Sequence, residues 1–358
     1  MPHPFLLSRV LLRFDSEESN LLNEVSAAAF TPDGSLWVGS DELASIERLT
    51  AVEPYVYGNH QPFAVSNFVK LANPDGEIDI EGLDYSDSYL WFTGSHSSKR
   101  KKAKGKKPDK DIQKLATIEV ELNRYMIARI PVIDGELVQS ASDPNHPEKT
   151  LTAAYLQTTE TGNLLTDALK DDPHLGVYMS TQLASKDNGF DVEGLTVRGN
   201  RIFLGLRGPV LGGWAIILEL EMNELEPGLL SLKRIGPDNR YYKKHFVNLN
   251  GLGIRELCLY QDDLIILAGP TMVLEGKMEI FKLKKAFNRD GDTIASADSG
   301  DLKSLFDLPF TIGSDHAEGL ALFKCLGQSN ALLVVYDAPD QARRIEPAAV
   351  LMDVFRLK

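Results

Sequence analysis

The chain alternates short apolar runs with turns rich in Asp, Gly and Asn, and this pattern recurs along its length. A typical copy begins with a β-rich run, passes a turn such as PDG (32–34), SDS (86–88) or RGN (198–200), and continues into a second run that ends in small residues. Paired short runs around such turns are typical of β-hairpins. Further β-rich runs follow the hairpins at 115–122, 214–222 and 277–283.

A Glu-Gly-Leu triplet, or a variant of it, marks the start of each copy. The copies begin at Asp79, Asp191, Gly253 and Asp315, with a weaker one at Asn23. Aligning them places five glutamates in register: Glu24, Glu81, Glu193, Glu256 and Glu318. Their spacing is about 59 residues, except for one gap about twice as long, in which a degenerate copy would lie near 125–160. The pattern therefore predicts six units.

Hairpins repeated at this period are expected of β-propeller blades. We therefore predict an all-β protein, a single six-bladed β-propeller domain spanning 1–358 with a repeat of about 59 residues. Tandem β-sandwiches are the alternative arrangement of such strands. The N-terminal run around 5–14 would pair with the C-terminal run 350–357, which removes an open sheet edge.

Two segments interrupt the repeat. Residues 99–107, KRKKAKGKK, contain seven Lys or Arg, and we expect 99–112 to form a basic, flexible loop within a blade. The run has no aromatic residue on which a base could stack, so nucleic acid is an unlikely partner. In the second segment, 160–176, apolar residues share one helical face and Pro173 ends the pattern, so a short inserted helix is predicted near 160–172.

Composition and charge narrow the class of protein. The 358 residues include 43% apolar residues and carry a net charge of −13, as expected of a soluble globular chain. Cys258 and Cys325 cannot build a disulfide framework, which favours a cytoplasmic location. No apolar run approaches the roughly 20 residues that cross a bilayer, so no membrane partner is expected. Phosphate-binding and dinucleotide-binding motifs are absent, so no nucleotide or flavin cofactor is expected.

The recurring glutamates are the first candidates for a site. The first strand of a propeller blade lines the central channel, so these side chains would form a ring. Carboxylates held together need protons, cationic partners or a bound cation. Oxygen ligands favour Ca²⁺ or another hard divalent cation. Alternatively, each glutamate accepts hydrogen bonds from a neighbouring blade and only locks the blades together. The sequence leaves both interpretations open.

Polar residues outside the repeat pattern are expected near the mouth of the channel. Candidates for catalysis are His96, His316, Arg207 and Arg255, and candidates for ligand binding are Arg100, Lys186, Asp187, Asn188 and Asp315. Guanidinium groups bind phosphates and carboxylates through paired hydrogen bonds. An anionic small molecule is therefore the expected ligand, and the two histidines could act as general acid or base.

Several longer motifs carry a family resemblance. They are GSHSSKRKK (94–102), NRYMIARIPV (123–132), SKDNGFDVEGL (185–195), LGLRGPVLGGWA (204–215), NGLGIREL (250–257), IILAGPTM (265–272) and DHAEGL (315–320). From about residue 20 to the C-terminus, the chain resembles DUF3616, a family of unknown function. It is more distantly similar to the esterase-like phytases and other metal-dependent propeller hydrolases. The resemblance implies a propeller and leaves the activity open.

Three functions are consistent with these features. The first is a divalent-metal-dependent hydrolase of phosphoesters or related esters, in which the metal activates water and the arginines stabilise developing charge. The second is a non-catalytic binder of an anionic metabolite. The third is a protein-interaction scaffold that uses the basic segment and the inserted helix to hold a protein partner.

Overall fold

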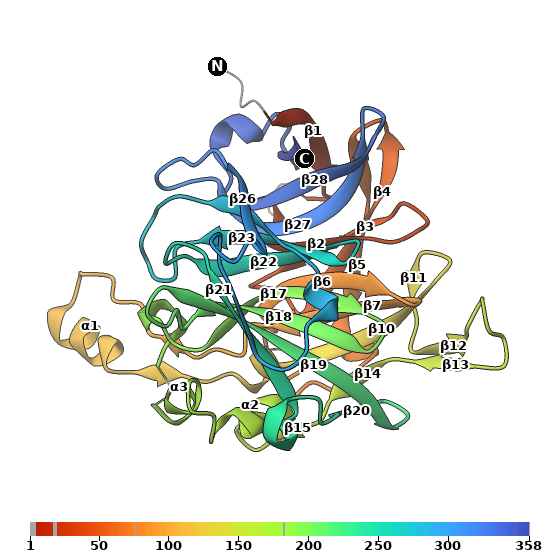
Figure 1. Cartoon of the computed structure of the whole chain (residues 1–358). Coiled ribbons are helices and arrows are strands. Elements are labelled where there is room, and N and C mark those ends of the chain that lie inside the picture. The colour runs from red at the N-terminus through yellow and green to blue at the C-terminus, as the bar shows by residue number, and fades with distance from the viewer. Residues whose placement is uncertain (1–4, 17–19, 75, 182, 358) are drawn as a thin grey trace.

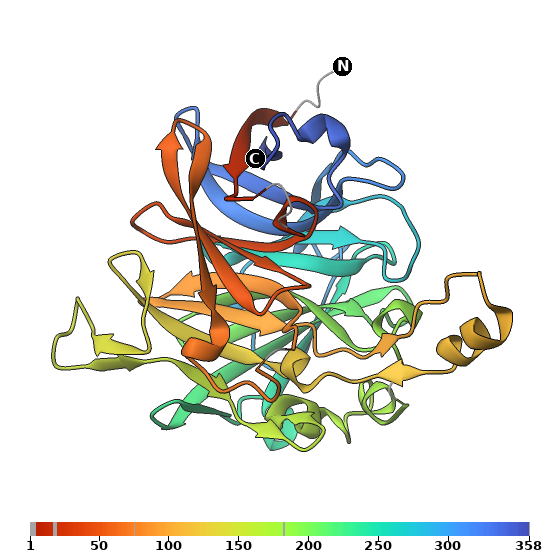
Figure 2. The ribbon, with the colours of Figure 1, turned by 180° about the vertical axis from the view of Figure 1, so that it is seen from behind.

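The computed structural model describes residues 5–16, 20–74, 76–181 and 183–357, and strands make up most of them. Figure 1 shows the strand β1 (Leu6–Arg13) close to the C-terminal part of the chain, coloured blue, at the top of the molecule. The helix α1 (Pro108–Leu115) projects from the body, as the reverse view in Figure 2 also shows. No helix among the described residues is long and apolar enough to cross a membrane.

Twenty strands form five antiparallel units of four. Unit 1 contains β2 (Val25–Phe30), β3 (Leu36–Ser40), β4 (Ser45–Glu53) and β5 (Val56–Ala64). Unit 2 contains β6 (Ile80–Ser86), β7 (Tyr89–Gly94), β10 (Ile127–Ile133) and β14 (Ala154–Leu156). Unit 3 contains β17 (Asp191–Arg198), β18 (Arg201–Gly208), β19 (Trp214–Glu226) and β21 (Tyr242–Asn248). Unit 4 contains β22 (Gly253–Tyr260), β23 (Asp263–Gly269), β24 (Glu279–Leu283) and β26 (Leu302–Asp307). Unit 5 contains β27 (His316–Cys325), β28 (Gln328–Asp337), β29 (Ala349–Arg356) and β1 (Leu6–Arg13).

Shorter elements lie outside this pattern. The strands are β8 (Lys99–Arg100), β9 (Ile118–Glu119), β11 (Glu136–Leu137), β12 (Ser140–Ser142), β13 (Thr150–Thr152), β15 (Thr158–Thr159), β16 (Gly162–Asn163), β20 (Leu229–Leu232) and β25 (Thr293–Ala295). The α-helices are α1 (Pro108–Leu115), α2 (Leu164–Leu169) and α3 (Gly176–Thr181). Single 3-10 turns are η1 (Asn20–Leu22), η2 (Val65–Asn67), η3 (Leu122–Tyr125), η4 (Ser185–Asp187), η5 (Pro237–Asn239), η6 (Ala286–Asn288) and η7 (Gln341–Arg343).

The first strands of the five units pack against one another in a closed cycle. In this cycle β2 contacts β6, β6 contacts β17, β17 contacts β22, β22 contacts β27, and β27 returns to β2. Apolar side chains fill the space between successive sheets, as where Trp37 of unit 1 joins Phe92 of unit 2 in one buried cluster. Because both faces of each sheet are covered, a strand such as β7 is buried along its whole length.

The all-β prediction is confirmed, whereas the count of six units is not. The described residues form five first strands, and residues 125–160 form no separate unit. Strand β10 instead pairs with β7, from Ile127 opposite Thr93 to Pro131 opposite Tyr89, and so completes unit 2. The long gap between Glu81 and Glu193 is filled by insertions into this unit and by the helices that follow it. Spacing alone could not distinguish an insertion from a degenerate repeat.

The chain ends meet as the terminal pattern predicts. Strand β1 pairs antiparallel with β29, with Leu12 opposite Val350. Strand β1 also pairs with β5 in parallel, so units 5 and 1 share one eight-stranded sheet. Inside the basic segment, Lys99 and Arg100 form β8 and α1 begins at Pro108. Helix α2 lies within the region predicted to be helical, where Asn163 caps its first turn.

Candidate functional site

Each first strand contains a bulge at the same place, and the bulges define a ring of side chains. The register shifts across Ser26 on β2, Glu81 on β6, Glu193 on β17, Arg255 on β22 and Glu318 on β27. A bulge leaves one residue unpaired and turns its side chain out of the regular alternation. The repeated position therefore holds three glutamates, one arginine and one serine.

Two of the predicted ring glutamates lie elsewhere. Glu256 follows the bulge on β22, and Glu24 precedes the one on β2 by two residues. In the β22 copy the following leucine gives the correct register, because Leu257 matches Leu195 and Arg255 matches Glu193. Alignment on the acidic residue shifts this copy by one residue. The β2 copy has Ala28 in place of the leucine, and alignment on Glu24 shifts it by two residues.

Glu256 joins two neighbouring units. Its side chain is fully buried, and its Oε1 accepts hydrogen bonds from the N–H of Leu195 on β17 at 2.9 Å and of Leu257 at 2.8 Å. Burial raises the pKa of this carboxyl well above its usual value. These contacts are those expected of a glutamate that locks adjacent units together.

Buried arginines neutralise several carboxylates of the ring. Arg207 lies 2.5 Å from Asp191 and 2.6 Å from Glu193. Arg255 lies 3.0 Å from the other oxygen of Glu193 and also pairs with Glu318. The sequence singled out both arginines as candidates for catalysis, with neutralisation of the glutamates as the alternative role, and these contacts are those of the alternative role.

A third buried arginine, Arg124, is not among the site residues that the sequence predicts. Arg124 pairs with Asp79, and its Nε donates to Ser95 Oγ at 3.0 Å. It comes from η3, outside the repeated motif. Sequence spacing therefore offered no reason to place it beside Asp79.

A cavity of about 210 Å³ lies among the first strands; we call it the central cavity. Its walls carry the carboxylates of Asp41, Asp79, Glu81, Asp191, Glu193 and Glu318, together with Arg124 and Arg207. Burial, reinforced by neighbouring carboxylates, raises the pKa of Asp41 to about 7. Burial and the charge of Glu193 raise the pKa of Glu81 well above its usual value.

Asp41 and Glu81 differ from the other carboxylates of the central cavity in their partners. Among the described residues, neither makes an ion pair within 4.0 Å, and Oδ1 of Asp41 is buried without a hydrogen-bond partner. The pKa values of Asp191 and Glu318 are about 7, mainly through burial, although an arginine lowers each. Among the described residues, Asp41 and Glu81 are thus the carboxylates inside the cavity without a cationic partner, whereas Glu42, which also lines it, is exposed to solvent.

The predicted ligand-binding residues divide between two cavities. Lys186 and Arg100 line the central cavity, where Arg100 also pairs with Asp187 at 2.7 Å. Asp315 lines an adjoining cavity and accepts hydrogen bonds from Arg343 at 2.7 Å and from the N–H of Asp340. Asn188 has a left-handed backbone, with φ of 62°, and lines neither cavity.

His316 lies between the two cavities in a polar setting. It lines the adjoining cavity, and its Nδ1 is 3.6 Å from Oδ2 of Asp337. The interaction with Asp337 raises the pKa of His316 above its usual value. Since Asp337 lines the central cavity as well, His316 is the histidine that the structure brings to the candidate site.

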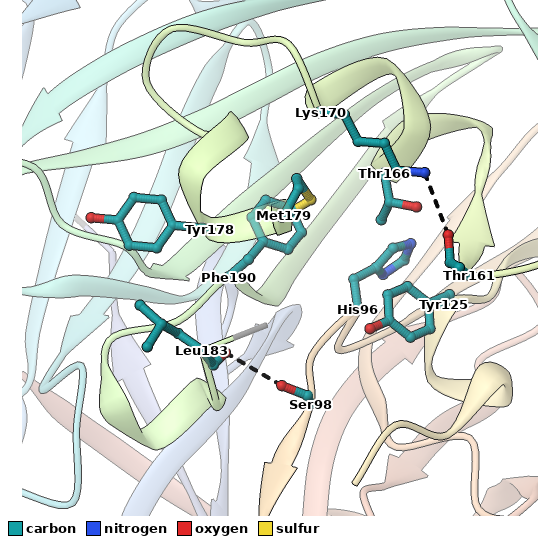
Figure 3. A pocket seen from close by; sticks show the side chains of 10 residues that line it. All are labelled: His96, Ser98, Tyr125, Thr161, Thr166, Lys170, Tyr178, Met179, Leu183 and Phe190. Carbon is teal, nitrogen blue, oxygen red and sulfur yellow. Dashed lines mark hydrogen bonds between the residues drawn. The ribbon is translucent and has the colours of Figure 1, made fainter. Parts of the chain in front are cut away.

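His96 lies away from the central cavity, in a separate pocket of about 200 Å³ beside α2 and α3 (Figure 3). Its Nδ1 lies 2.8 Å from the carbonyl oxygen of Gly94, and its Nε2 lies 2.8 Å from the amide nitrogen of Asn163. Nδ1–H therefore donates to Gly94, and Nε2 accepts from Asn163. Burial lowers the pKa of His96 to about 4. With both ring nitrogens engaged, His96 anchors the insertion rather than serving the ring.

At the place where the sequence predicts a metal site, the structure has arginines as well as carboxylates. No group of three or more His, Cys, Asp or Glu side chains in the described ranges is arranged to hold a metal ion. Arg255 lies between Glu193 and Glu318, where a ring of carboxylates alone would leave room for a cation. The residues that could still ligate a cation are Asp41 and Glu81, because their charges are not matched by a guanidinium.

Solved structures of low similarity cover nearly the whole chain. A streptogramin B lyase has 10% identity and a TM-score of 0.38, with 98% of each chain covered. The PQQ-bound aldose sugar dehydrogenase from Streptomyces coelicolor has 12% identity and a TM-score of 0.37, with 98% of this chain and 99% of that chain covered. A virginiamycin B lyase from Staphylococcus aureus has 12% identity and a TM-score of 0.36, with 98% and 100% covered. These values support no conclusion about activity.

No curated protein matches the chain. A family model does, and it spans most of the residues that build the five units. The model described as "Protein of unknown function (DUF3616)" matches residues 24–353, and the chain therefore belongs to the DUF3616 family.

Proposed function

We propose that the five units are the blades of a five-bladed β-propeller and that the central cavity is its functional site, which binds a cationic group. The closed cycle of contacts among β2, β6, β17, β22 and β27 supports the blade count. A propeller gathers one residue from each inner strand around its axis. The bulged residues are such a set, and Glu81, Glu193 and Glu318 line the cavity.

One observation carries the proposal: the arginines of the ring already have carboxylate partners, whereas Asp41 and Glu81 have no cation. Asp41 and Glu81 are partly buried, and an uncompensated carboxylate in such a place is costly and is relieved by a proton or by a bound cation. Arg207 and Arg255, in contrast, would have to leave Glu193 before binding an anion. The interior of the cavity therefore favours a positive ligand over the anion that the sequence suggests.

Two kinds of cation are considered for these carboxylates. Ca²⁺ prefers several oxygen ligands, and since no group of three or more His, Cys, Asp or Glu among the described residues is arranged to hold a metal ion, Asp41 and Glu81 would supply only part of its ligands. An organic ammonium group needs fewer ligands and tolerates a mixed ring of carboxylates and arginines. An anionic substituent on such a ligand has a place only at the mouth, where Lys102 and Lys186 line the cavity.

Calorimetric titration tests the proposal. The probes are Ca²⁺, Mn²⁺ and methylammonium, each measured near pH 8 and near pH 5. We expect at least one to bind more tightly at the higher pH, because protons compete for the same carboxylates. Glu81→Gln should weaken that binding at least about tenfold, a loss of about 1.4 kcal/mol. Absence of binding by all three probes would refute the cation site.

Hydrolysis at this site is the second candidate, and the pKa values favour it. Asp41, Asp191 and Glu318 have pKa values of about 7, which suits general acid–base catalysis near neutral pH. Arg207 lies against Asp191 and Glu193, and it would stabilise developing negative charge once one of these carboxylates takes up a proton. A metal held by Asp41 and Glu81 would polarise an ester and lower the pKa of a bound water.

Turnover assays separate hydrolysis from simple binding. A panel of a phosphomonoester, a phosphodiester, a carboxylic ester and a lactone is assayed with Ca²⁺, with Mn²⁺ and with chelator. Activity that Asp41→Asn abolishes and that follows a bell-shaped pH profile would support the hydrolase. Ligand-dependent stabilisation without turnover would favour a binding protein.

A further inference from the structure

An apolar wall stands beside the mouth of the central cavity. It consists of Met272, Val273 and Leu274, which follow β23, and of Phe310, which follows β26. These side chains are solvent-exposed, Val273 by 77% and Leu274 by 65%. Ile312, 81% exposed, continues the second of the two segments. Clusters of exposed apolar side chains on a soluble surface commonly mark binding sites.

The two segments that carry the wall are fastened to each other. The N–H of Gly313 donates to the Glu275 carboxylate at 2.6 Å. A β-bridge between Thr311 and Ser314 closes the second segment on itself. These contacts hold the apolar side chains in one place, so the wall is a built surface and not two independent loops.

The wall continues directly into the carboxylate site. It lines the adjoining cavity, about 200 Å³ in volume, together with Arg207, Glu318 and Asp337. The same three residues line the central cavity. The two cavities therefore adjoin, so a ligand bound in one can extend into the other.

We propose that the ligand of this site is an amphipathic organic cation, with an ammonium head in the central cavity and an apolar chain or ring along the 272–274 and 310 wall. This inference rests on the proposed cation site and adds the chemical class of the ligand. A bare metal ion makes no use of the wall. An apolar molecule without charge leaves Asp41 and Glu81 unmatched. Only a molecule with both parts satisfies both surfaces.

A series of straight-chain alkylammonium ions tests the inference, from methylammonium to hexylammonium at constant ionic strength near pH 8. Each methylene that moves from water onto the wall should tighten binding about twofold to fourfold. In the double variant Val273→Ser/Leu274→Ser the gain per methylene should disappear, while methylammonium binds as in the wild type. Both side chains are exposed, so the variant should keep the melting temperature of the wild type.

Controls separate the wall from general hydrophobic effects. Leu225→Ser removes a similarly exposed leucine from the far end of β19 and should leave the series unchanged. Glu81→Gln should weaken every member of the series, because it acts on the head group.

The outcomes distinguish the two proposals. Methylammonium binding without any dependence on chain length would refute the amphipathic ligand and leave the cation site standing. A chain-length dependence that persists in the double variant would also refute it, since the chain would then lie elsewhere. Binding of Ca²⁺ alone, with no ammonium ion bound, would overturn the inference, and absence of all binding would overturn both proposals.

Discussion

Arg255 occupies on β22 the bulge position that Glu193 occupies on β17, and Nε of Arg255 lies 3.0 Å from Oε2 of Glu193. Successive units thus place opposite charges at equivalent positions of the ring. Arg255 also pairs with Glu318, the next bulged residue. One arginine on the middle strand therefore compensates the carboxylates on both sides of it.

Removing this arginine should destabilise the protein strongly. Arg255→Gln leaves Glu193 and Glu318 buried with less compensation, and breaking a buried pair costs about 3–5 kcal/mol. Their pKa values, already raised, should rise further. A carboxyl whose folded-state pKa is raised favours folding at low pH and loses that contribution as pH rises through the folded pKa. The defect measured by urea denaturation should therefore be larger near pH 8 than near pH 5.

An exposed pair provides the matched control for Arg255→Gln. Lys233 lies 2.6 Å from Glu221 in a solvent-exposed setting, and Lys233→Gln should change the free energy of unfolding by only about 0–1 kcal/mol. Equal effects of the two variants would show that Arg255 is not needed for charge compensation.

The residues of the ring show which parts of the fold and the site can be predicted from the sequence. The hairpins and their turns follow from local patterns, because alternating apolar residues and Asp/Gly turns act within a few residues. The pairing of the terminal strands follows instead from the need to close an open sheet edge. Glu81, Glu193 and Glu318 could be recognised because they recur. Arg255 breaks the motif at the same position, so its equivalence becomes visible only from the bulge or from the leucine that follows.

Other features of the site depend on contacts that no local pattern encodes. Arg124 reaches Asp79 from η3, more than 40 residues along the chain. Asp41 lies at the end of the weaker first copy of the repeat, and its raised pKa results from burial and from carboxylates such as Asp79 and Asp337, which are distant in the sequence. His96 is a catalytic candidate because the sequence places it near the mouth of a hairpin, and its partners Gly94 and Asn163 become visible only in the structure. The roles of Arg124, Asp41 and His96 thus depend on their burial and on partners that are far away in the sequence.

Glu256 should be replaceable by glutamine but not by alanine. The amide oxygen of Glu256→Gln can still accept from the N–H groups of Leu195 and Leu257, whereas Glu256→Ala leaves both without an acceptor and should cost about 2–5 kcal/mol. Because the raised folded-state pKa of Glu256 makes the wild type lose stability as pH rises, Glu256→Gln should equal the wild type near pH 5 and exceed it near pH 8. Urea denaturation at both values checks this. A destabilised glutamine variant would mean that the charge itself is required.

The stability of the ligand-free protein should fall between about pH 4 and about pH 7. Asp41 has a folded-state pKa of about 7, above its usual value of 3.8, so the folded state binds more protons in this window. Each such proton gives a slope of about 1.4 kcal/mol per pH unit. Asp41→Asn should make the slope shallower, whereas the exposed control Asp262→Asn should not. Identical slopes in all three proteins would contradict the raised pKa.

Asn163→Ala should loosen the α2 region without affecting the central cavity. Asn163 Oδ1 accepts from the N–H groups of Leu165 and Thr166, and its amide donates to His96 and to the carbonyl of Tyr125. Losing the helix cap and these buried partners should cost about 2–4 kcal/mol. Calorimetric binding of the cationic probe should be unchanged in the folded variant. Weakened binding would show that His96 and the central cavity are coupled.

Replacing two lysines at the mouth of the central cavity tests whether the ligand is a cation or an anion. Lys102 and Lys186 line the central cavity, and replacing both with glutamine lowers the positive potential there without touching the carboxylates inside. A cationic probe should then bind more tightly, by about twofold to fivefold at low ionic strength, because two like charges that oppose its entry are gone. Added salt should shrink the difference, since exposed charges are screened over about 10 Å at 0.1 M. Lys303→Gln, on the exposed face of β26, is the control and should change nothing. Tighter binding of inorganic phosphate to the wild type than to the double variant, with no gain for methylammonium, would instead return the site to an anionic ligand and overturn the proposed function.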